Sequence, residues 1–313
     1  MKRREQVMGS LAVLLAASFY GVMSPIVKGA YGEGHTFPQI TFSQFFYATL
    51  FYLPFFLWRM GKVKIPIREG VWLFFVGVIG LGGTSLFYYA SLQYLPASIS
   101  LILLFQFVWI GLLMDRLFFK KKGSPLQLFS VLIVLLGTFF AVPLSYEGGG
   151  IYLPGFLLGL AAAVSYSFFL IGTSHISHHM EGWFRSAWMV IGAMTVIGLI
   201  FLTYVPLQEL NPFGGMTKWG LLLGLLGQVF PPLLFSYGAP KIGGSLTSLL
   251  GSMELPVGLL AAFFLLKEEI NLVQWMGILL IFSGILLTQL EQFINGKGQG
   301  RIPYRRKTHG ENG

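Results

Sequence analysis

The chain is a succession of apolar runs of about twenty residues, separated by short joins that contain charges, Gly or Pro. A helix needs roughly 20 mostly apolar residues to cross about 30 Å of hydrocarbon. Cutting the runs at charges and turn residues predicts ten membrane-spanning helices, with the weakest breaks at 94–96 and 243–244. The expected spans are residues 7–27, 38–58, 71–91, 96–114, 125–143, 153–173, 184–204, 219–239, 245–266 and 272–292.

Composition supports a membrane-embedded body. Of the 313 residues, 55% are hydrophobic and only 11% are charged, whereas soluble domains usually carry about a quarter charged residues. The absence of cysteine excludes disulfides, thiolate metal sites and cysteine nucleophiles. The 40 Gly and 15 Pro residues are typical of closely packed, locally broken membrane helices. We therefore expect an all-α polytopic membrane protein.

The basic residues predict how the chain lies in the membrane. With a cytoplasmic N-terminus, 18 of the 21 basic residues fall on cytoplasmic segments, and the exceptions are Lys28, Lys218 and Lys267. An odd number of spans would move the basic tail outside, so the bias favours ten spans in the cell membrane with both termini cytoplasmic. The tail 301–307 is too short to favour nucleic acid over anionic lipid. The first apolar run resembles a signal peptide, but nine further spans argue against its cleavage.

The two halves of the chain repeat at an offset of 147 residues. Matching pairs include Trp72 with Trp219, Gln127 with Gln274 and Gly137 with Gly284. Because five is odd, the second half would enter the membrane from the opposite side, which makes the halves inverted repeats. Such halves can open a shared cavity to either side, and the alternative is a duplicated bundle without transport. The expected parts are a cytoplasmic N-terminus 1–6, repeats 7–143 and 153–292, an external linker 144–152 and a basic tail 293–313.

Short motifs in both halves carry a family resemblance. The second half contains Met253-Glu254-Leu255-Pro256-Val257, Gln274-Trp275-Met276-Gly277 and Gly284-Ile285-Leu286-Leu287, and the first contains Phe19-Tyr20-Gly21 and Tyr94-Leu95-Pro96-Ala97-Ser98. Over about residues 9–292 the chain resembles the EamA-type repeats of the drug/metabolite transporter superfamily. The resemblance implies ten helices and the export or exchange of small organic metabolites, such as amino acids, without ATP. The first half departs from the pattern with Phe107-Val108-Trp109 opposite Glu254, and with Lys121 opposite Glu268.

Glu254 is the only acidic residue deep inside an expected span. A charged carboxylate at that depth costs on the order of 2.5–3.5 kcal/mol, so it should face a cavity or a partner. Thr247, Gly251 and Gly258 share its stripe at helical spacing. Glu254 is thus a candidate for binding a substrate amine or a coupling proton. The alternative is a carboxyl group hydrogen-bonded to a neighbouring helix as packing.

Polar and aromatic residues near mid-span are further cavity candidates. Amides can orient a ligand and aromatic rings can clamp one, although interhelical hydrogen bonds, packing and the interfacial aromatic belt remain alternatives. Prolines inside the spans break the helices and are candidate hinges. The cavity candidates beside Glu254 are Gln228, Gln106, Trp109, Tyr88, Tyr20 and Tyr237, and the hinge candidates are Pro25, Pro231, Pro232 and Pro256.

The sequence gives little support for a metal site, a nucleotide-binding loop or a catalytic centre. His175, His178 and His179 lie in one loop near Glu181, but no further ligand has a fixed spacing, so we expect a solvated loop and no metal or cofactor. Gly148-Gly149-Gly150 lacks the lysine of a nucleotide-binding loop. A membrane-embedded enzyme and a channel-like scaffold remain the alternatives to a transporter, although one lone acid supplies neither a catalytic pair nor a charged ring. A homodimer is left open.

Overall fold

The structure is a computed structural model, which describes residues 2–60, 62, 66–119, 124–141, 152–175, 180–242 and 250–296. Within these ranges the chain is helical and forms no strand. The helices of the first half are α1 (Lys2–Gly21), α2 (Met23–Gly32), α3 (Phe37–Met60), α4 (Ile67–Phe75), η1 (Val76–Gly82), α5 (Gly83–Leu92), α6 (Ala97–Leu104), α7 (Phe107–Phe119) and α8 (Pro125–Ala141). Those of the second half are α9 (Leu153–His175), α10 (Gly182–Tyr204), α11 (Met216–Leu223), η2 (Gly224–Val229), α12 (Phe230–Ile242), α14 (Glu254–Leu266) and α15 (Leu272–Gly296).

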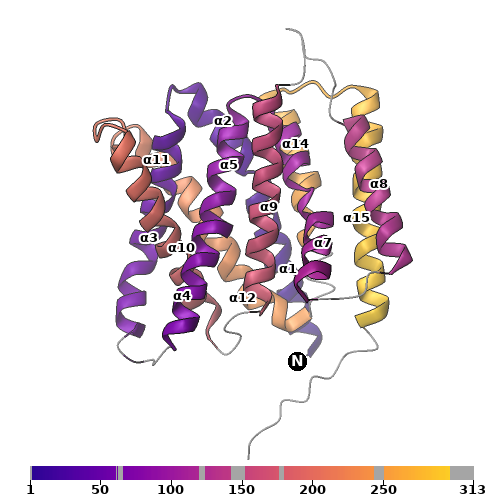
Figure 1. Cartoon of the computed structure of the whole chain (residues 1–313), viewed down its shortest axis with the longest axis horizontal. Coiled ribbons are helices and arrows are strands. Elements are labelled where there is room, and N and C mark those ends of the chain that lie inside the picture. Colours follow the sequence, from indigo (N-terminus) through magenta and orange to yellow (C-terminus); the bar gives the residue numbers. More distant parts are fainter. Residues whose placement is uncertain are drawn as a thin grey trace, which may run out of the picture.

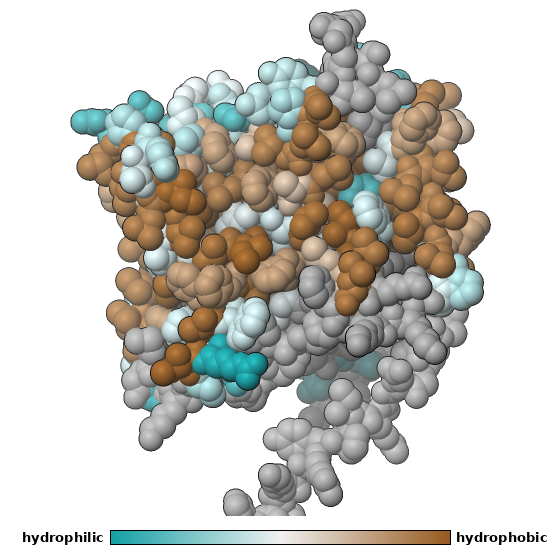
Figure 2. All heavy atoms as spheres, in the orientation of Figure 1, coloured by the Kyte–Doolittle hydropathy of each residue, from teal (hydrophilic) through white to brown (hydrophobic). Residues whose placement is uncertain are grey.

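The described helices begin and end close to the apolar runs of the sequence. Six helical stretches are long and apolar enough to cross a membrane, namely Arg4–Gly32, Phe37–Arg59, Ile67–Leu92, Leu153–Leu170, Gly182–Tyr204 and Met216–Phe235. Four shorter apolar stretches are Ala97–Gly111, Leu128–Ala141, Glu254–Leu266 and Leu272–Leu287. Figure 2 shows hydrophobic residues around the waist of one face, with hydrophilic residues at its upper and lower edges. The protein is therefore a multi-pass membrane protein.

Several helices are interrupted, and the interruptions recur at corresponding positions of the two halves. The π-helix η1 lies between α4 and α5, and the π-helix η2 lies between α11 and α12 about 147 residues later. A turn at 105–106 separates α6 from α7, and a turn at 252–253 precedes α14, again 147 residues apart. Single-turn π-helices are rare and gather at functional sites, so these breaks indicate where the bundle is specialised.

The packing of the helices follows the same correspondence. α5 packs on α9 as α12 packs on α1, and η1 packs on α10 as η2 packs on α3. The corresponding helices α8 and α15 lie side by side in Figure 1. A Cβ on Gly137 would lie 2.7 Å from the Gly277 carbonyl oxygen, and one on Gly284 would lie 2.9 Å from the Ser130 carbonyl oxygen. Early residues of α8 thus meet late residues of α15, so the two helices run antiparallel.

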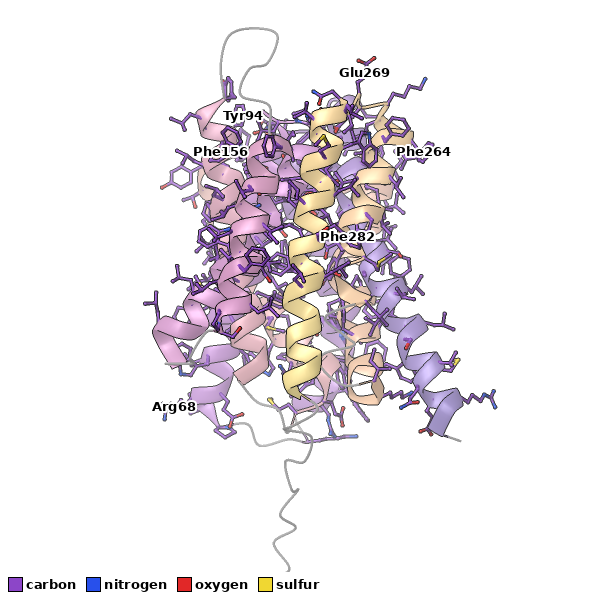
Figure 3. The ribbon with its side chains drawn as sticks, turned by 90° about the vertical axis from the view of Figure 1, so that its right-hand side faces the viewer. Arg68, Tyr94, Phe156, Phe264, Glu269 and Phe282 are labelled. Carbon is purple, nitrogen blue, oxygen red and sulfur yellow. The ribbon has the colours of Figure 1, made fainter. Side chains whose placement is uncertain are left out.

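Charged side chains mark the two ends of the bundle. Figure 1 shows the N-terminus at the lower edge of the molecule, and Figure 3 shows Arg68 at that same edge. Tyr94 and Glu269 lie at the opposite edge in Figure 3, while Phe282 of α15 lies between the two. The apolar waist thus separates two polar edges, which is the arrangement that a bilayer imposes.

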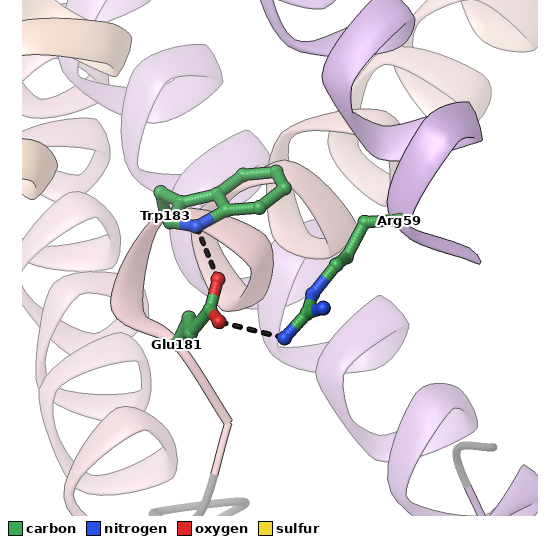
Figure 4. A network of polar contacts seen from close by, with 3 residues as sticks. All are labelled: Arg59, Glu181 and Trp183. Atoms are coloured by element: carbon green, nitrogen blue, oxygen red, sulfur yellow. Dashed lines mark hydrogen bonds and ion pairs between the residues drawn. The ribbon is translucent and has the colours of Figure 1, made fainter. Parts of the chain in front are cut away.

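A polar cluster ties the end of α3 to the start of α10. The Arg59 Nη2 donates to Glu181 Oε1 at 2.6 Å, and the Trp183 indole Nε1 donates to Glu181 Oε2 at 2.6 Å (Figure 4). Glu181 directly precedes α10. This cluster joins the first half of the chain to the second.

A similar cluster lies after α2. The Lys218 Nζ donates to Glu33 Oε1 at 2.6 Å, and the Trp219 Nε1 donates to Glu33 Oε2 at 2.9 Å. Trp219 also covers Gly29 of α2. Glu33 stands 148 residues before Glu181, so corresponding loops carry carboxylates with the same kinds of partner, a basic side chain and an indole.

Candidate functional site

A cavity of about 60 Å³ lies where helices of both halves meet. At about 15 Å³ for each water, it has room for a few water molecules or one small polar group. Its aromatic lining consists of Tyr20, Tyr88, Tyr89 and Tyr166. Its polar lining consists of Gln44, Thr84, Ser85, Gln228 and Glu254, and its other lining residues are Met23, Leu81, Leu104 and Gly227.

Among the described residues of this lining, Glu254 alone carries a formal charge. Its side chain is buried, with 8% of the residue exposed, and it opens α14. The carboxylate of Glu254 interacts electrostatically with the hydroxyl groups of Tyr20, Tyr88 and Tyr166. None of the hydrogen bonds recorded between described residues involves its carboxylate, and no Lys, Arg or His lines the cavity. A buried acid without a basic partner favours a cation or a proton in the cavity.

The position of Glu254 follows from two helix breaks that pack together. Pro25 is the third residue of α2, so it leaves the carbonyl of Gly21 without its usual helical donor. A Cβ on Gly258 would lie 2.9 Å from that carbonyl oxygen, and a Cβ on Gly21 would lie 2.8 Å from the Glu254 carbonyl oxygen. The glycines therefore bring the break between α1 and α2 against the start of α14, beside the cavity.

The four hinge candidates all lie within the first three residues of a helical segment, and α12 continues directly from η2. Pro25 begins α2, Pro231 and Pro232 begin α12, and Pro256 begins α14. Pro232 frees the carbonyl of Gln228, and the buried Tyr52 hydroxyl donates to that oxygen at 3.4 Å. The prolines thus sit at breaks, and their role as hinges stays a prediction.

Four of the predicted cavity residues come together in the structure. Glu254, Gln228, Tyr88 and Tyr20 line the same cavity, from α14, η2, α5 and α1. Tyr20 also stacks on Phe235, with ring centroids 6.3 Å apart. Residues far apart in the sequence therefore meet at one place, as a binding site requires.

Gln106 and Trp109 are placed differently, outside the cavity lining. The Gln106 Nε2 donates to the Ile102 carbonyl at 3.0 Å and to Thr138 Oγ1 at 2.8 Å, and its Oε1 accepts from Trp109 Nε1 at 2.9 Å. These contacts favour the packing alternative for both residues.

Tyr237, the remaining cavity candidate, lies on the surface. It is 47% exposed, and the Lys241 Nζ stands 3.1 Å above its ring centroid. A cation over a tyrosine face near a helix end is typical of an interfacial anchor.

The sequence analysis missed several lining residues, above all Gln44 of α3. Its side chain is fully buried, and both of its amide atoms lack a hydrogen-bond partner. The signal was present, because Gln44 interrupts the apolar run 40–50 as Gln228 interrupts its own run. Thr84 and Ser85 gave no such signal, since hydroxyls commonly bond their own helix, as the Thr84 Oγ1 does to the Gly80 carbonyl.

The histidine loop of the sequence prediction lies mostly outside the described residues. His178, His179 and the side chain of His175 lie outside the described residues, as does Thr247. Among the residues that are described, no three of His, Cys, Asp and Glu are grouped closely enough to hold a metal ion.

Comparison with known proteins identifies the family. The model of the EamA-like transporter family matches the chain twice, at residues 7–142 and 153–290. The chain belongs to the EamA-like transporter family. As an EamA-like transporter it is a membrane transporter of small molecules.

Curated relatives cover most of the chain at low identity. An uncharacterized transporter of Synechocystis sp. is 23% identical over 95% of this chain and 97% of its own length. The threonine/homoserine exporter RhtA of Escherichia coli is 25% identical over 85% of this chain and 84% of its own length. A solved crystal structure of a protein with 19% identity superposes with a TM-score of 0.60, covering 94% of this chain and 99% of that one. The last likeness shows a shared fold.

Proposed function

We propose that this EamA-like transporter is a secondary transporter of the cell membrane, which moves a small amino acid-like amine by alternating access, as an exporter or exchanger. The observation that carries the proposal is the cavity itself. Its described lining holds one buried carboxylate and no base, and both halves of the chain contribute to it. A protonated amine of the ligand would neutralise Glu254, and a proton would do so when the ligand has left.

The proposed architecture is ten spans in two inverted repeats, residues 7–143 and 153–292. The six long and four shorter apolar helices support this number. The antiparallel contact of α8 with α15, the recurring breaks and the matching helix pairs support the inversion. Broken helices beside a central site are the usual construction of transporters with inverted repeats.

The proposed orientation places both termini in the cytoplasm. The N-terminus and Arg68 share one edge of the bundle in the figures, and Glu269 lies at the other (Figures 1 and 3). Most basic residues belong to segments on the N-terminal side of the membrane, as the positive-inside rule demands of a cytoplasmic face.

The amino acid-like substrate is supported by the chemistry of the lining. Glu254 suits an ammonium group, tyrosine rings add their negative faces, and amides and hydroxyls provide further hydrogen bonds. The name of the relative RhtA, an exporter of threonine and homoserine, points to the same class of ligand.

The test is transport of L-threonine by the purified protein in liposomes. We expect saturable uptake, acceleration by L-threonine on the opposite side, and recovery of the amino acid unchanged. Glu254→Gln should lower the initial rate at least about tenfold, since it removes the only charge that the ammonium group can pair with.

The matched control is Glu269→Gln, which removes a carboxylate at an exposed edge position and should leave the rate within about twofold of wild type. Wild-type transport by the Glu254 variant would refute the role of this carboxylate. Chemical conversion of the amino acid would favour the enzyme alternative, and uptake without saturation or exchange would favour a channel.

A further inference from the structure

Gln44 is a buried amide whose hydrogen-bonding groups are unused. The residue has 0% exposure, lines the cavity from the middle of α3, and has no hydrogen-bond partner at Nε2 or Oε1. The Tyr89 hydroxyl is near enough to the Gln44 side chain for a weak hydrogen-bonding contact, although neither amide atom has a hydrogen-bond partner of normal geometry. Leaving a buried donor or acceptor unpaired costs about 1–3 kcal/mol. Other buried hydroxyls, such as that of Ser43, are also unpaired, but Gln44 lines the cavity, where a bound polar group would supply the missing partners.

A second amide lines the same cavity. Gln228 is 5% exposed, and its Oε1 is also without a partner. The glycines of η2 allow α3 to pack closely on η2. The Gln44 Nε2 lies 3.2 Å from where a Cβ of Gly227 would stand, and the Gln44 carbonyl oxygen lies 2.9 Å from the corresponding point of Gly224. Larger residues in η2 would push α3 and its amide away.

Gln106 shows what a glutamine used for packing looks like in this protein. Its amide donates to Ile102 and Thr138 and accepts from Trp109, so both of its polar atoms are paired within the bundle. Gln44 and Gln228 differ because both residues line the cavity and have side-chain atoms without such partners. A flip of the Gln44 amide exchanges the positions of Nε2 and Oε1. The side chain then still has one donor group and one acceptor without a partner.

The free atoms select the chemistry of the ligand. Together the pair offers an unused donor group and two unused acceptors beside the carboxylate of Glu254. A hydroxyl or a carboxamide both donates and accepts, so it can pair with the two amides at once. A ligand side chain that ends in a carboxylate only accepts hydrogen bonds, so it would leave the two amide oxygens unpaired, and an alkyl group would pair with neither amide.

We propose that Gln44 and Gln228 form a specificity subsite, which binds a hydroxyl or carboxamide group of the amine held at Glu254. The proposal rests on the proposed function and adds its selectivity. Sites built to bond a hydroxyl reject the analogue that lacks it, because their own buried groups are then left unpaired.

The test compares two amino acids that differ by one hydroxyl, L-threonine and L-2-aminobutyrate, in liposomes containing the full chain. For the wild type we expect the KM of L-2-aminobutyrate to be at least about tenfold higher, which corresponds to one lost hydrogen bond. Gln44→Leu keeps the size of the side chain and removes the amide. It should raise the KM of L-threonine to that of L-2-aminobutyrate, and change the latter less than about twofold.

The control is Ser43→Ala, which alters the neighbouring fully buried residue outside the cavity lining and should leave both KM values unchanged. The thermal unfolding temperature of each variant in detergent confirms that the fold is intact. Equal KM values in the wild type, or equal losses for both amino acids in Gln44→Leu, would overturn the subsite while transport stands. If neither amino acid is transported, the proposed function fails, and the subsite fails with it.

Discussion

At the scale of single residues, two exposed carboxylates hold the ends of the bundle together. Glu33 pairs with Lys218 and Trp219, and Glu181 pairs with Arg59 and Trp183. Each carboxylate receives one charge-assisted and one indole hydrogen bond, and each links the first half of the chain to the second. Because surface ion pairs contribute little on their own, the geometry with two donors is what distinguishes these contacts.

The contribution of the Glu33 contacts to the stability of the fold can be measured through its dependence on pH. The hydrogen bonds from Lys218 and then Trp219 lower the pKa of the Glu33 carboxyl below its usual value of 4.5. A carboxyl group whose pKa is lower in the folded state than in the unfolded state stabilises the fold at pH values above 4.5. This contribution is lost as the pH falls through the pKa of the folded state. Glu33→Gln should therefore lower the unfolding temperature at neutral pH.

The difference from wild type should shrink to nothing once the pH is well below 4.5. Thermal unfolding in detergent across this range measures it, with Glu209→Gln in an exposed loop as the control. A difference that persists unchanged in acid would show that Glu33 acts through something other than its charge.

The sequence could predict part of the candidate site. Glu254 and Gln228 stand out because charge and amide groups are rare and costly in apolar runs. Gln106 is also an amide within an apolar run, but its side chain bonds to Thr138 and Trp109 and not to the cavity. The sequence could not predict this, because a pattern along one helix does not show which neighbour a polar group contacts. Tyr166 could not be distinguished from the many packing aromatics, since only the assembled bundle brings it beside the cavity.

At the scale of the elements, the paired π-helices η1 and η2 are the least predictable feature. The repeat of Gly77 at Gly224 and of Gly80 at Gly227 is visible in the sequence, but a change in helix winding is not. The reason lies in packing. A Cβ on Gly77 would stand 2.1 Å from the Met189 carbonyl oxygen, so η1 lies directly on the backbone of α10. Helix winding here follows from the need to bring two backbones together.

Gly77→Ala tests this close packing. The added methyl group must displace backbone, which we expect to cost about 1–3 kcal/mol or more. Gly111→Ala is the matched control, because the nearest atom to its Cβ position is 4.0 Å away. Thermal unfolding in detergent should show a clear loss for the first variant and almost none for the second. Equal stability of both would contradict the tight contact between η1 and α10.

At the scale of the whole molecule, the sequence predicts the helical membrane fold well, since span length and apolar composition are imposed by the bilayer. The repeat at 147 residues adds the correspondence of the halves, which the packing of α8 on α15 reflects. The cavity depends on the contact of many helices, so its size and lining emerge only in three dimensions.

Access to the cavity from both sides of the membrane is the property on which the proposed transport cycle depends. The chain has no cysteine, so Ser85→Cys places a single thiol in the cavity lining. Right-side-out and inside-out vesicles should both react with a membrane-impermeant thiol reagent, and L-threonine should slow both reactions. Reaction from one side only, with and without L-threonine, would contradict alternating access through this cavity.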